Sequence, residues 1–294
     1  MIKLFPKEKL IKYLLLATAS TSILVVILIF TFLAKEALPF AKEPGLGELL
    51  KHRWIPVSFQ RETFGILPLI SGSLLVTAIA TILMIPFGVG ASVYIAELAH
   101  PREREILKPF IEILAGIPSV VIGFFGLLIL VPAIKFIFGL SSGLTAMTGG
   151  MLLALMAIPT VISISEDAIR AVPQSYKSAS LALGASKMQT IWKVIVPAAL
   201  PGIITAIMLG IGRVVGETMA VMMVTGNAAV ITANPFDSVR TMTATIAAEM
   251  GEVAFGSIHY RALFCVGIVL LVTTFLLNVV AHRVLKKYGI GQVQ

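Results

Sequence analysis

An arginine and a glutamate, Arg213 and Glu217, lie inside an otherwise apolar segment that runs from Pro201 to Gly226. The segment is long enough to cross a bilayer, where a charged side chain costs at least about 2.5–3.5 kcal/mol. Side chains four residues apart share one face of a continuous helix, so we expect these two to lie together. A guanidinium is a planar, permanently charged set of donors that suits an oxyanion. The spacing therefore predicts an anion contact within the membrane, with a structural ion pair as the alternative.

Two tasks are open to Glu217 beside this arginine. It either accepts a hydrogen bond from a protonated oxygen of the bound anion, which a sulfate would lack, or holds the guanidinium when no anion is bound. Thr218 follows directly and is assigned to the same pathway. Gly212 and Gly216 have the G-x-x-x-G spacing, which predicts the close approach of a neighbouring helix.

The sequence contains no recognisable set of residues for catalysis or for binding a metal. Cys265 is the one cysteine, which excludes an internal disulfide and a multi-cysteine metal site. Neither an H-E-x-x-H motif nor a G-x-x-x-x-G-K-[ST] phosphate loop is present. We therefore expect no catalytic residue, no metal ligand and no cofactor in this chain.

Composition indicates a protein that is embedded in a bilayer. Hydrophobic residues make up 57% of the 294 residues and charged residues only 13%, and the mean hydropathy is +0.98. The net charge of +8 is explained by basic residues that flank membrane spans rather than by nucleic-acid binding. Each span satisfies its backbone hydrogen bonds as a helix, so we predict an all-α membrane protein with six transmembrane helices. The predicted spans are 13–34, 66–96, 107–138, 144–164, 201–225 and 262–284.

The distribution of lysine and arginine predicts the orientation. More of the 23 basic residues fall on the side of the N-terminus, so both termini are expected in the cytoplasm. The first apolar run is too long for a signal peptide and has no small-residue cleavage site, so we interpret it as an uncleaved span. The predicted parts are an N-terminal segment 1–63 with the first span and an external loop, a transmembrane domain 64–285 with the cytoplasmic loop 165–200, and a cytoplasmic tail 286–294.

Two spans contain residues that interrupt helices. Gly116-Ile117-Pro118-Ser119 predicts a break or kink in the third span, and Pro159-Thr160 predicts a kink in the fourth. Backbone groups freed in a membrane are tolerated where they are buried in protein or line a cavity. The break therefore favours a translocation pathway with Ser119 as a hydroxyl ligand, and a kink for packing is the alternative.

The long cytoplasmic connection 165–200 is expected to form two short helices. Pro173 favours a helix start just before Gln174, and Gly184 favours its end. A second short helix is expected from Ser186 and should end before Pro197.

A signature within this connection resembles that of ABC importer permeases, E-A-A-x3-G-x9-I-x-L-P. The chain has Ser178-Ala179-Ser180, then Gly184, and nine residues later Val194-Ile195-Val196-Pro197, so the spacing matches and the acidic residue is replaced by serine. The resemblance implies the type I ABC importer permease fold and a coupling helix that docks in a cleft of a partner ATPase. The residues assigned to this coupling loop are Ser178, Ala179, Ser180, Gly184 and Pro197.

Further segments narrow the resemblance. Residues 112–123, 213–221 and the pair Gly226-Asn227 resemble phosphate permeases of the PstC type, and the likeness covers about 64–285. This resemblance implies a phosphate importer in a prokaryotic plasma membrane, with a PstA-type second permease, two PstB-type ATPase subunits and an external PstS-type binding protein. ATP and magnesium would be bound by the ATPase subunits. The alternatives are a permease for molybdate or sulfate and, in another class, an ion-coupled secondary carrier, which needs no docking loop.

Overall fold

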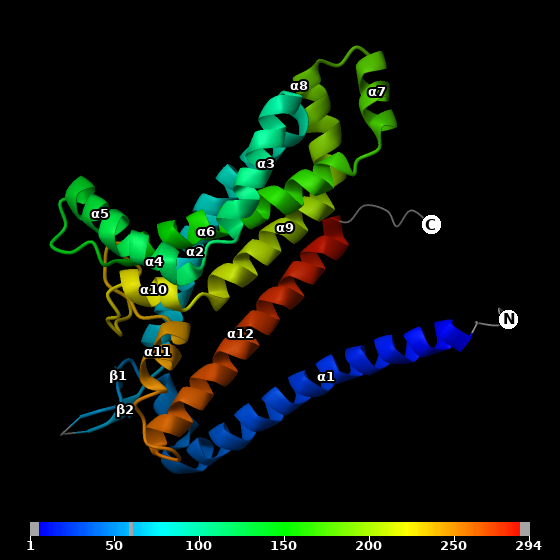
Figure 1. The fold of residues 1–294 in the computed structure, drawn as a ribbon. Coiled ribbons are helices and arrows are strands. Elements are labelled where there is room, and N and C mark those ends of the chain that lie inside the picture. The colour runs from blue at the N-terminus through cyan, green and yellow to red at the C-terminus, as the bar shows by residue number, and fades with distance from the viewer. Residues whose placement is uncertain (1–5, 59–60, 289–294) are drawn as a thin grey trace.

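The computed structural model describes residues 6–58 and 61–288, and helices account for every long element in these ranges (Figure 1). Six helical segments are long and apolar enough to cross a membrane, which confirms the predicted number of spans. They are Lys9–Leu50, Leu67–Leu98, Ser119–Phe138, Ala146–Arg170, Lys187–Gly216 and Ile258–Val280.

The longest connection between the described elements runs from residue 225 to residue 241. The first half contains α1 (Pro6–Phe40), η1 (Ala41–Gly45), η2 (Leu46–Leu50), β1 (Trp54–Ile55), β2 (Thr63–Phe64), α2 (Leu67–Val93), η3 (Tyr94–Leu98), α3 (Pro101–Ala115), α4 (Ser119–Phe125), η4 (Gly126–Leu130) and α5 (Val131–Phe138). The second half contains α6 (Ala146–Arg170), α7 (Gln174–Ala182), α8 (Lys187–Thr190), η5 (Ile191–Ile195), α9 (Val196–Gly216), α10 (Met219–Val224), α11 (Met242–Glu249) and α12 (Ile258–Tyr288).

Helices α2, α6 and α9 form the centre of the bundle, and small residues allow them to pack closely. A Cβ on Gly150 of α6 would lie 2.4 Å from Ile79 of α2, and one on Gly210 of α9 would lie 2.8 Å from Val161 of α6. In a bilayer, helices gain little from hydrophobic burial and associate through such close contacts. The three helices therefore provide a rigid frame for the polar residues inside the bundle.

The end of the bundle opposite the α7–α8 loop is closed by a small aromatic core. The strands β1 and β2 pair antiparallel, with Trp54 opposite Phe64. Phe40 at the end of α1 packs edge-to-face on Phe64, and Leu263 of α12 is fully buried in the same cluster. The hairpin thus ties the first loop to the last span.

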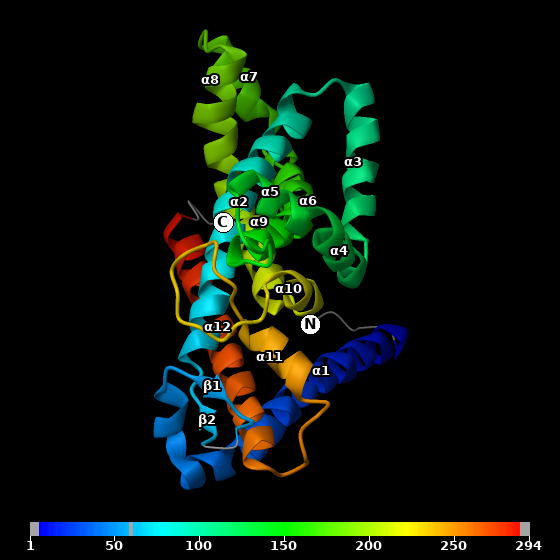
Figure 2. The ribbon, with the colours of Figure 1, turned by 90° about the vertical axis from the view of Figure 1, so that its left-hand side faces the viewer.

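Helix α1 diverges from the rest of the bundle in both views (Figures 1 and 2). None of the side chains in its most apolar stretch is buried against the described part of the chain. It meets α12 near its C-terminal end, where Phe32 packs edge-to-face on Phe264. The exposed apolar surface of α1 is therefore available to lipid or to another subunit.

Several span boundaries differ from the sequence-based prediction, and two of the differences have a clear physical cause. The third span begins at Ser119 rather than at 107, because α3 carries a charged face and lies along α6 as a separate amphipathic helix. Pro197 does not end the second short helix, since the helix runs on from Lys187 to Gly216. A proline lacks the N–H and crowds the preceding turn, and here the wider π-helical turn Ile191–Ile195 precedes it.

Candidate functional site

The predicted fifth span, 201–225, is interrupted one turn after Arg213. Helix α9 ends at Gly216, Glu217 adopts an extended conformation with φ −71° and ψ 133°, and α10 begins at Met219. The prediction that Arg213 and Glu217 share one face of a continuous helix is therefore wrong. Among the described residues no ion pair joins them, because the chain leaves the helix between the two side chains.

Glu217 has partners that stabilise the break. Its Oε1 accepts a hydrogen bond from the backbone N–H of Ala220 at 3.3 Å, which satisfies a free donor in the first turn of α10. Its carbonyl oxygen accepts a hydrogen bond from Thr243 Oγ1 at 2.9 Å. The carboxylate thus caps a helix, and the freed backbone carbonyl is bonded to α11.

Arg213 lies half-buried in the last turn of α9. Its Nη1 donates a hydrogen bond to Thr160 Oγ1 of α6 at 3.1 Å. The other guanidinium donors have no hydrogen-bond partner within the ranges that the structure describes, so they are free for an anion. From the sequence, Thr160 is predicted only as part of a kink with Pro159, and no sequence pattern predicts a contact between its hydroxyl and Arg213.

The predicted break at residues 116–118 is present, and it separates the amphipathic helix α3 from the start of the third span. Helix α3 ends at Ala115 and α4 begins at Ser119, which is half-buried. Helix α4 packs on α10 so closely that a Cβ on Gly123 would lie 2.9 Å from the backbone of Ala220. Farther along, Gly126 lies beside Val224.

These contacts show that the half-helices α4 and α10 run side by side in the same direction. Ser119 and Thr218 therefore lie at the starts of two packed helices. Thr218 Oγ1 donates to the carbonyl of Gly216 at 3.3 Å, and no described hydrogen bond joins Ser119 to Arg213.

Behind Glu217 lies a small hollow with a hydroxyl-rich lining that sequence reasoning did not find. Its volume of about 10 Å³ suits a single water molecule and is too small for a tetrahedral oxyanion. Ser73 Oγ accepts a hydrogen bond from the backbone N–H of Met242 at 2.9 Å, which ties α2 to the start of α11. The hydroxyl residues of the lining are Ser73, Thr77, Thr241 and Thr243.

Gly212 and Gly216 face open space rather than a helix of the same chain. A Cβ added at either glycine would meet no atom within 4 Å in the described structure. The close helix approach that their spacing predicts therefore requires a second subunit and stays a prediction.

The predicted coupling loop contains a helix with the expected start and stop. Helix α7 begins at Gln174, directly after Pro173, and the chain reverses at Gly184 with a φ of +83°. Ser178 Oγ donates to the carbonyl of Gln174 one turn earlier at 3.1 Å, so its hydroxyl is bonded within α7. Ser180 Oγ lies 2.9 Å from Thr190 Oγ1 and joins α7 to α8, while Ala179 is exposed.

A buried carboxylate joins α3 to α6 one turn before the end of α6. The side chain of Glu166 is 2% exposed and lies 2.8 Å from both Arg104 Nη2 and Lys108 Nζ. Lys108 also binds Asp167 at 2.8 Å. Its hydrogen bonds to Asp167 and Glu166 raise the pKa of the lysine above its usual value. The basic residues on α3 lie at least 58 positions before their acidic partners on α6, so no local sequence pattern predicted the cluster.

The fold and the coupling loop define a class of transport protein. Residues 85–288 match the family described as "Binding-protein-dependent transport system inner membrane component", and the chain belongs to this family. It is thus a multi-pass permease subunit of an ABC transporter in the plasma membrane, and it works with an ATPase and a binding protein.

Individual relatives extend the comparison along most of the chain. "Probable ABC transporter permease protein YqgH" of Bacillus subtilis is 43% identical over 213 residues, 72% of this chain and 69% of that protein. "Phosphate transport system permease protein PstC" of Mesorhizobium japonicum is 33% identical over 262 residues, 83% of this chain and 79% of that protein. "Phosphate transport system permease protein PstC 1" of Mycobacterium tuberculosis is 35% identical over 248 residues, with coverage of 76% and 73%.

Solved structures confirm the predicted fold. A chain of a bacterial alginate ABC transporter superposes with a TM-score of 0.67 at 14% identity and covers 98% of this chain and 99% of its own length. A chain of the MetNI methionine ABC transporter superposes with a TM-score of 0.60 at 19% identity, with coverage of 84% and 98%. The fold is that of a type I ABC importer permease.

Proposed function

We propose that this chain is the permease subunit of an ATP-driven importer of inorganic phosphate. The observation that carries the proposal is Arg213, a guanidinium inside a membrane span with one hydroxyl partner and free donors. The likeness to phosphate permeases over most of the chain supports phosphate as the anion. The chain translocates the substrate and catalyses no reaction.

Arg213 serves as the anion contact in the pathway. Its planar fork binds two oxygens of a tetrahedral oxyanion, and Thr160 holds the side chain in place from α6. Ser119 and Thr218 lie at the breaks before α4 and α10, and their hydroxyls contribute to the pathway. Glu217 stabilises the break through Oε1, and its Oε2 accepts a hydrogen bond from a protonated oxygen of phosphate.

Transport follows alternating access and depends on partners. A PstA-type permease forms the heterodimer, two PstB-type ATPase subunits bind ATP and magnesium, and a PstS-type binding protein delivers phosphate from outside. This chain itself binds no cofactor. ATP hydrolysis moves the coupling helix α7, and this motion changes the side of the membrane from which phosphate can reach Arg213.

The test is substrate uptake by the complete transporter in proteoliposomes. Labelled phosphate should accumulate when ATP and the binding protein are supplied, and unlabelled sulfate or molybdate in tenfold excess should not compete. ATP-dependent accumulation of sulfate or molybdate in place of phosphate would assign the other oxyanion. Uptake that proceeds without ATP and follows an ion gradient would overturn the ABC mechanism.

A further inference from the structure

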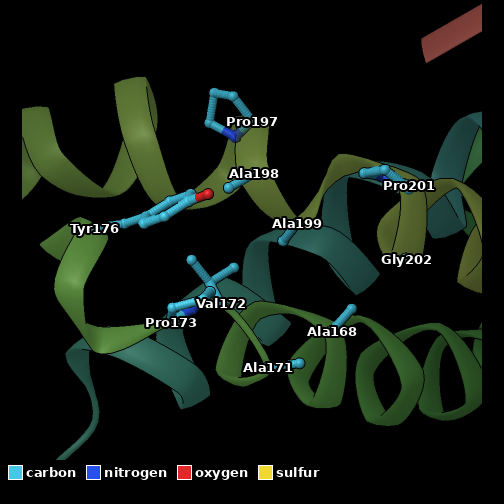
Figure 3. A pocket seen from close by; sticks show the side chains of 10 residues that line it. All are labelled: Ala168, Ala171, Val172, Pro173, Tyr176, Pro197, Ala198, Ala199, Pro201 and Gly202. Carbon is cyan, nitrogen blue, oxygen red and sulfur yellow. The ribbon is translucent and has the colours of Figure 1, made fainter. Parts of the chain in front are cut away.

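The coupling helix α7 is only loosely attached to the bundle by packing. None of its side chains is buried, and a hollow of about 570 Å³ separates it from the starts of the neighbouring helices. Figure 3 shows Tyr176 of α7 reaching into this hollow between Pro197 and Val172. The walls are formed by small residues and prolines of α6, α9 and their connections. Helix α7 therefore has room to move, and its remaining tethers decide what moves with it.

One of these tethers is an ion pair to α2. Lys177 Nζ in the middle of α7 donates to Glu97 Oε2 at 2.6 Å, across 80 positions of sequence. The carboxylate side chain is 10% exposed and the lysine side chain 28%, so the pair is largely shielded from solvent. Shielding strengthens the attraction and makes loss of either partner costly.

The other tethers of α7 do not reach α2. Ser180 bonds Thr190, which belongs to the same loop and its following helix. The backbone from Arg170 to Gln174 connects α7 to α6. Within the described ranges, the Lys177–Glu97 pair is the one ion pair or side-chain hydrogen bond that joins α7 directly to η3 and α2. The other connection of α2 to the coupling loop runs through its packing on α6 and α9.

Helix α2 leads directly to the pathway. Glu97 lies in η3, which continues α2 at the coupling-loop end. Val76, Ala80 and Met84 of α2 are buried against the central core over successive turns. Ser73, nearer the other end, lines the hollow behind Glu217. Helix α2 and η3 therefore connect Glu97 through the packed core to the hollow behind Glu217.

We propose that Glu97 and Lys177 are positioning residues that couple ATP hydrolysis to transport by linking the coupling helix to α2. The proposal rests on the proposed function of the chain as an importer subunit. Without the pair, α7 still docks and the ATPase still turns over, but the motion of α7 reaches α2 only through the packing of α2 on α6 and α9, so α2 follows it less completely. The measurable consequence is a lower number of phosphate ions transported per ATP hydrolysed.

The experiment compares phosphate uptake and ATP hydrolysis in proteoliposomes that hold the complete transporter. Glu97→Gln and Lys177→Glu should each lower the phosphate-to-ATP ratio roughly 10-fold, within the range found for single coupling residues. The charge-swapped double variant, Glu97→Lys with Lys177→Glu, should recover to within about twofold of the wild type because the attraction is restored. Lys187→Glu is the matched control, an exposed lysine of the same loop without an ion pair in the described structure.

A wild-type ratio in Glu97→Gln, or a double variant as impaired as Lys177→Glu alone, would overturn the proposal. The second result would show that Lys177 acts by contacting the ATPase instead. Phosphate uptake by the wild type in the same vesicles tests the phosphate assignment by itself. The role of the ion pair is tested separately, by comparing the phosphate-to-ATP ratio of each variant with that of the wild type.

Discussion

Replacement of Glu166 by glutamine should destabilise the protein by removing the buried charge that holds α3 to α6. The side chain is 2% exposed, and its two close cationic partners lie at 2.8 Å. Breaking a buried ion pair costs about 3–5 kcal/mol when the remaining charge stays buried. Arg104 and Lys108 are 26% and 30% exposed and recover part of their hydration, so we expect a loss of about 2–3 kcal/mol.

The assay is denaturant-induced unfolding in detergent micelles, followed by the fluorescence of Trp54 and Trp192. The matched control is Asp167→Asn, because Asp167 binds the same Lys108 Nζ at 2.8 Å but is 65% exposed. An exposed pair contributes about 0–1 kcal/mol, so this variant should remain close to the wild type. If Glu166→Gln costs no more than Asp167→Asn, the argument from burial is refuted.

Three further predictions follow from packing and charge. Gly123→Ala should weaken the pairing of α4 with α10 and lower phosphate uptake severalfold, because the new Cβ would lie 2.9 Å from the backbone of Ala220. Gly90→Ala is the control, since a Cβ there would meet no atom within 4 Å. Equal uptake by both variants would contradict the close approach of the two helices. Gly212→Leu should leave the thermal unfolding of the isolated chain unchanged but reduce copurification with the second permease, and unchanged copurification would exclude this glycine from the interface. The contribution of Lys108 to the free energy of unfolding should be constant between about pH 6 and 9. The pKa of Lys108 is raised in the folded state, so this contribution is fully present below the usual pKa of 10.5 and is lost only as the pH rises through the folded-state pKa. A difference in unfolding free energy between the wild type and Lys108→Met that changes within this range would contradict the assignment.

Local signals in the sequence predicted the local structure. Pro173 and Gly184 gave the start and end of α7, and Gly116 with Pro118 gave the break between α3 and α4. Each of these residues restricts or permits backbone angles by itself, so no tertiary contact is needed to interpret it. The number of spans followed in the same way from the length of the apolar runs.

The geometry around Arg213 could not be predicted from spacing. The apolar run continues without proline through Gly216, so it predicts one helix, whereas tertiary bonds to Thr243 and the packing of α10 on α4 stabilise a break there. Pairs such as Glu97 with Lys177 join different helices, and their partners depend on helix arrangement rather than on a local pattern. The charged face of α3 is a similar case, because its partner Glu166 lies within the fourth span.

The central claim is that Arg213 binds phosphate during translocation. The most direct measurement is ATP-dependent uptake of labelled phosphate by proteoliposomes that contain Arg213→Gln, with the assembly of the complex and the uptake by wild type measured in parallel. Loss of a charge-assisted hydrogen-bond donor to a bound anion costs about 1.5–3 kcal/mol, so we predict a fall of roughly 10- to 150-fold in the rate at limiting phosphate while the complex stays assembled. Uptake at the wild-type rate by an assembled Arg213→Gln complex would contradict the claim.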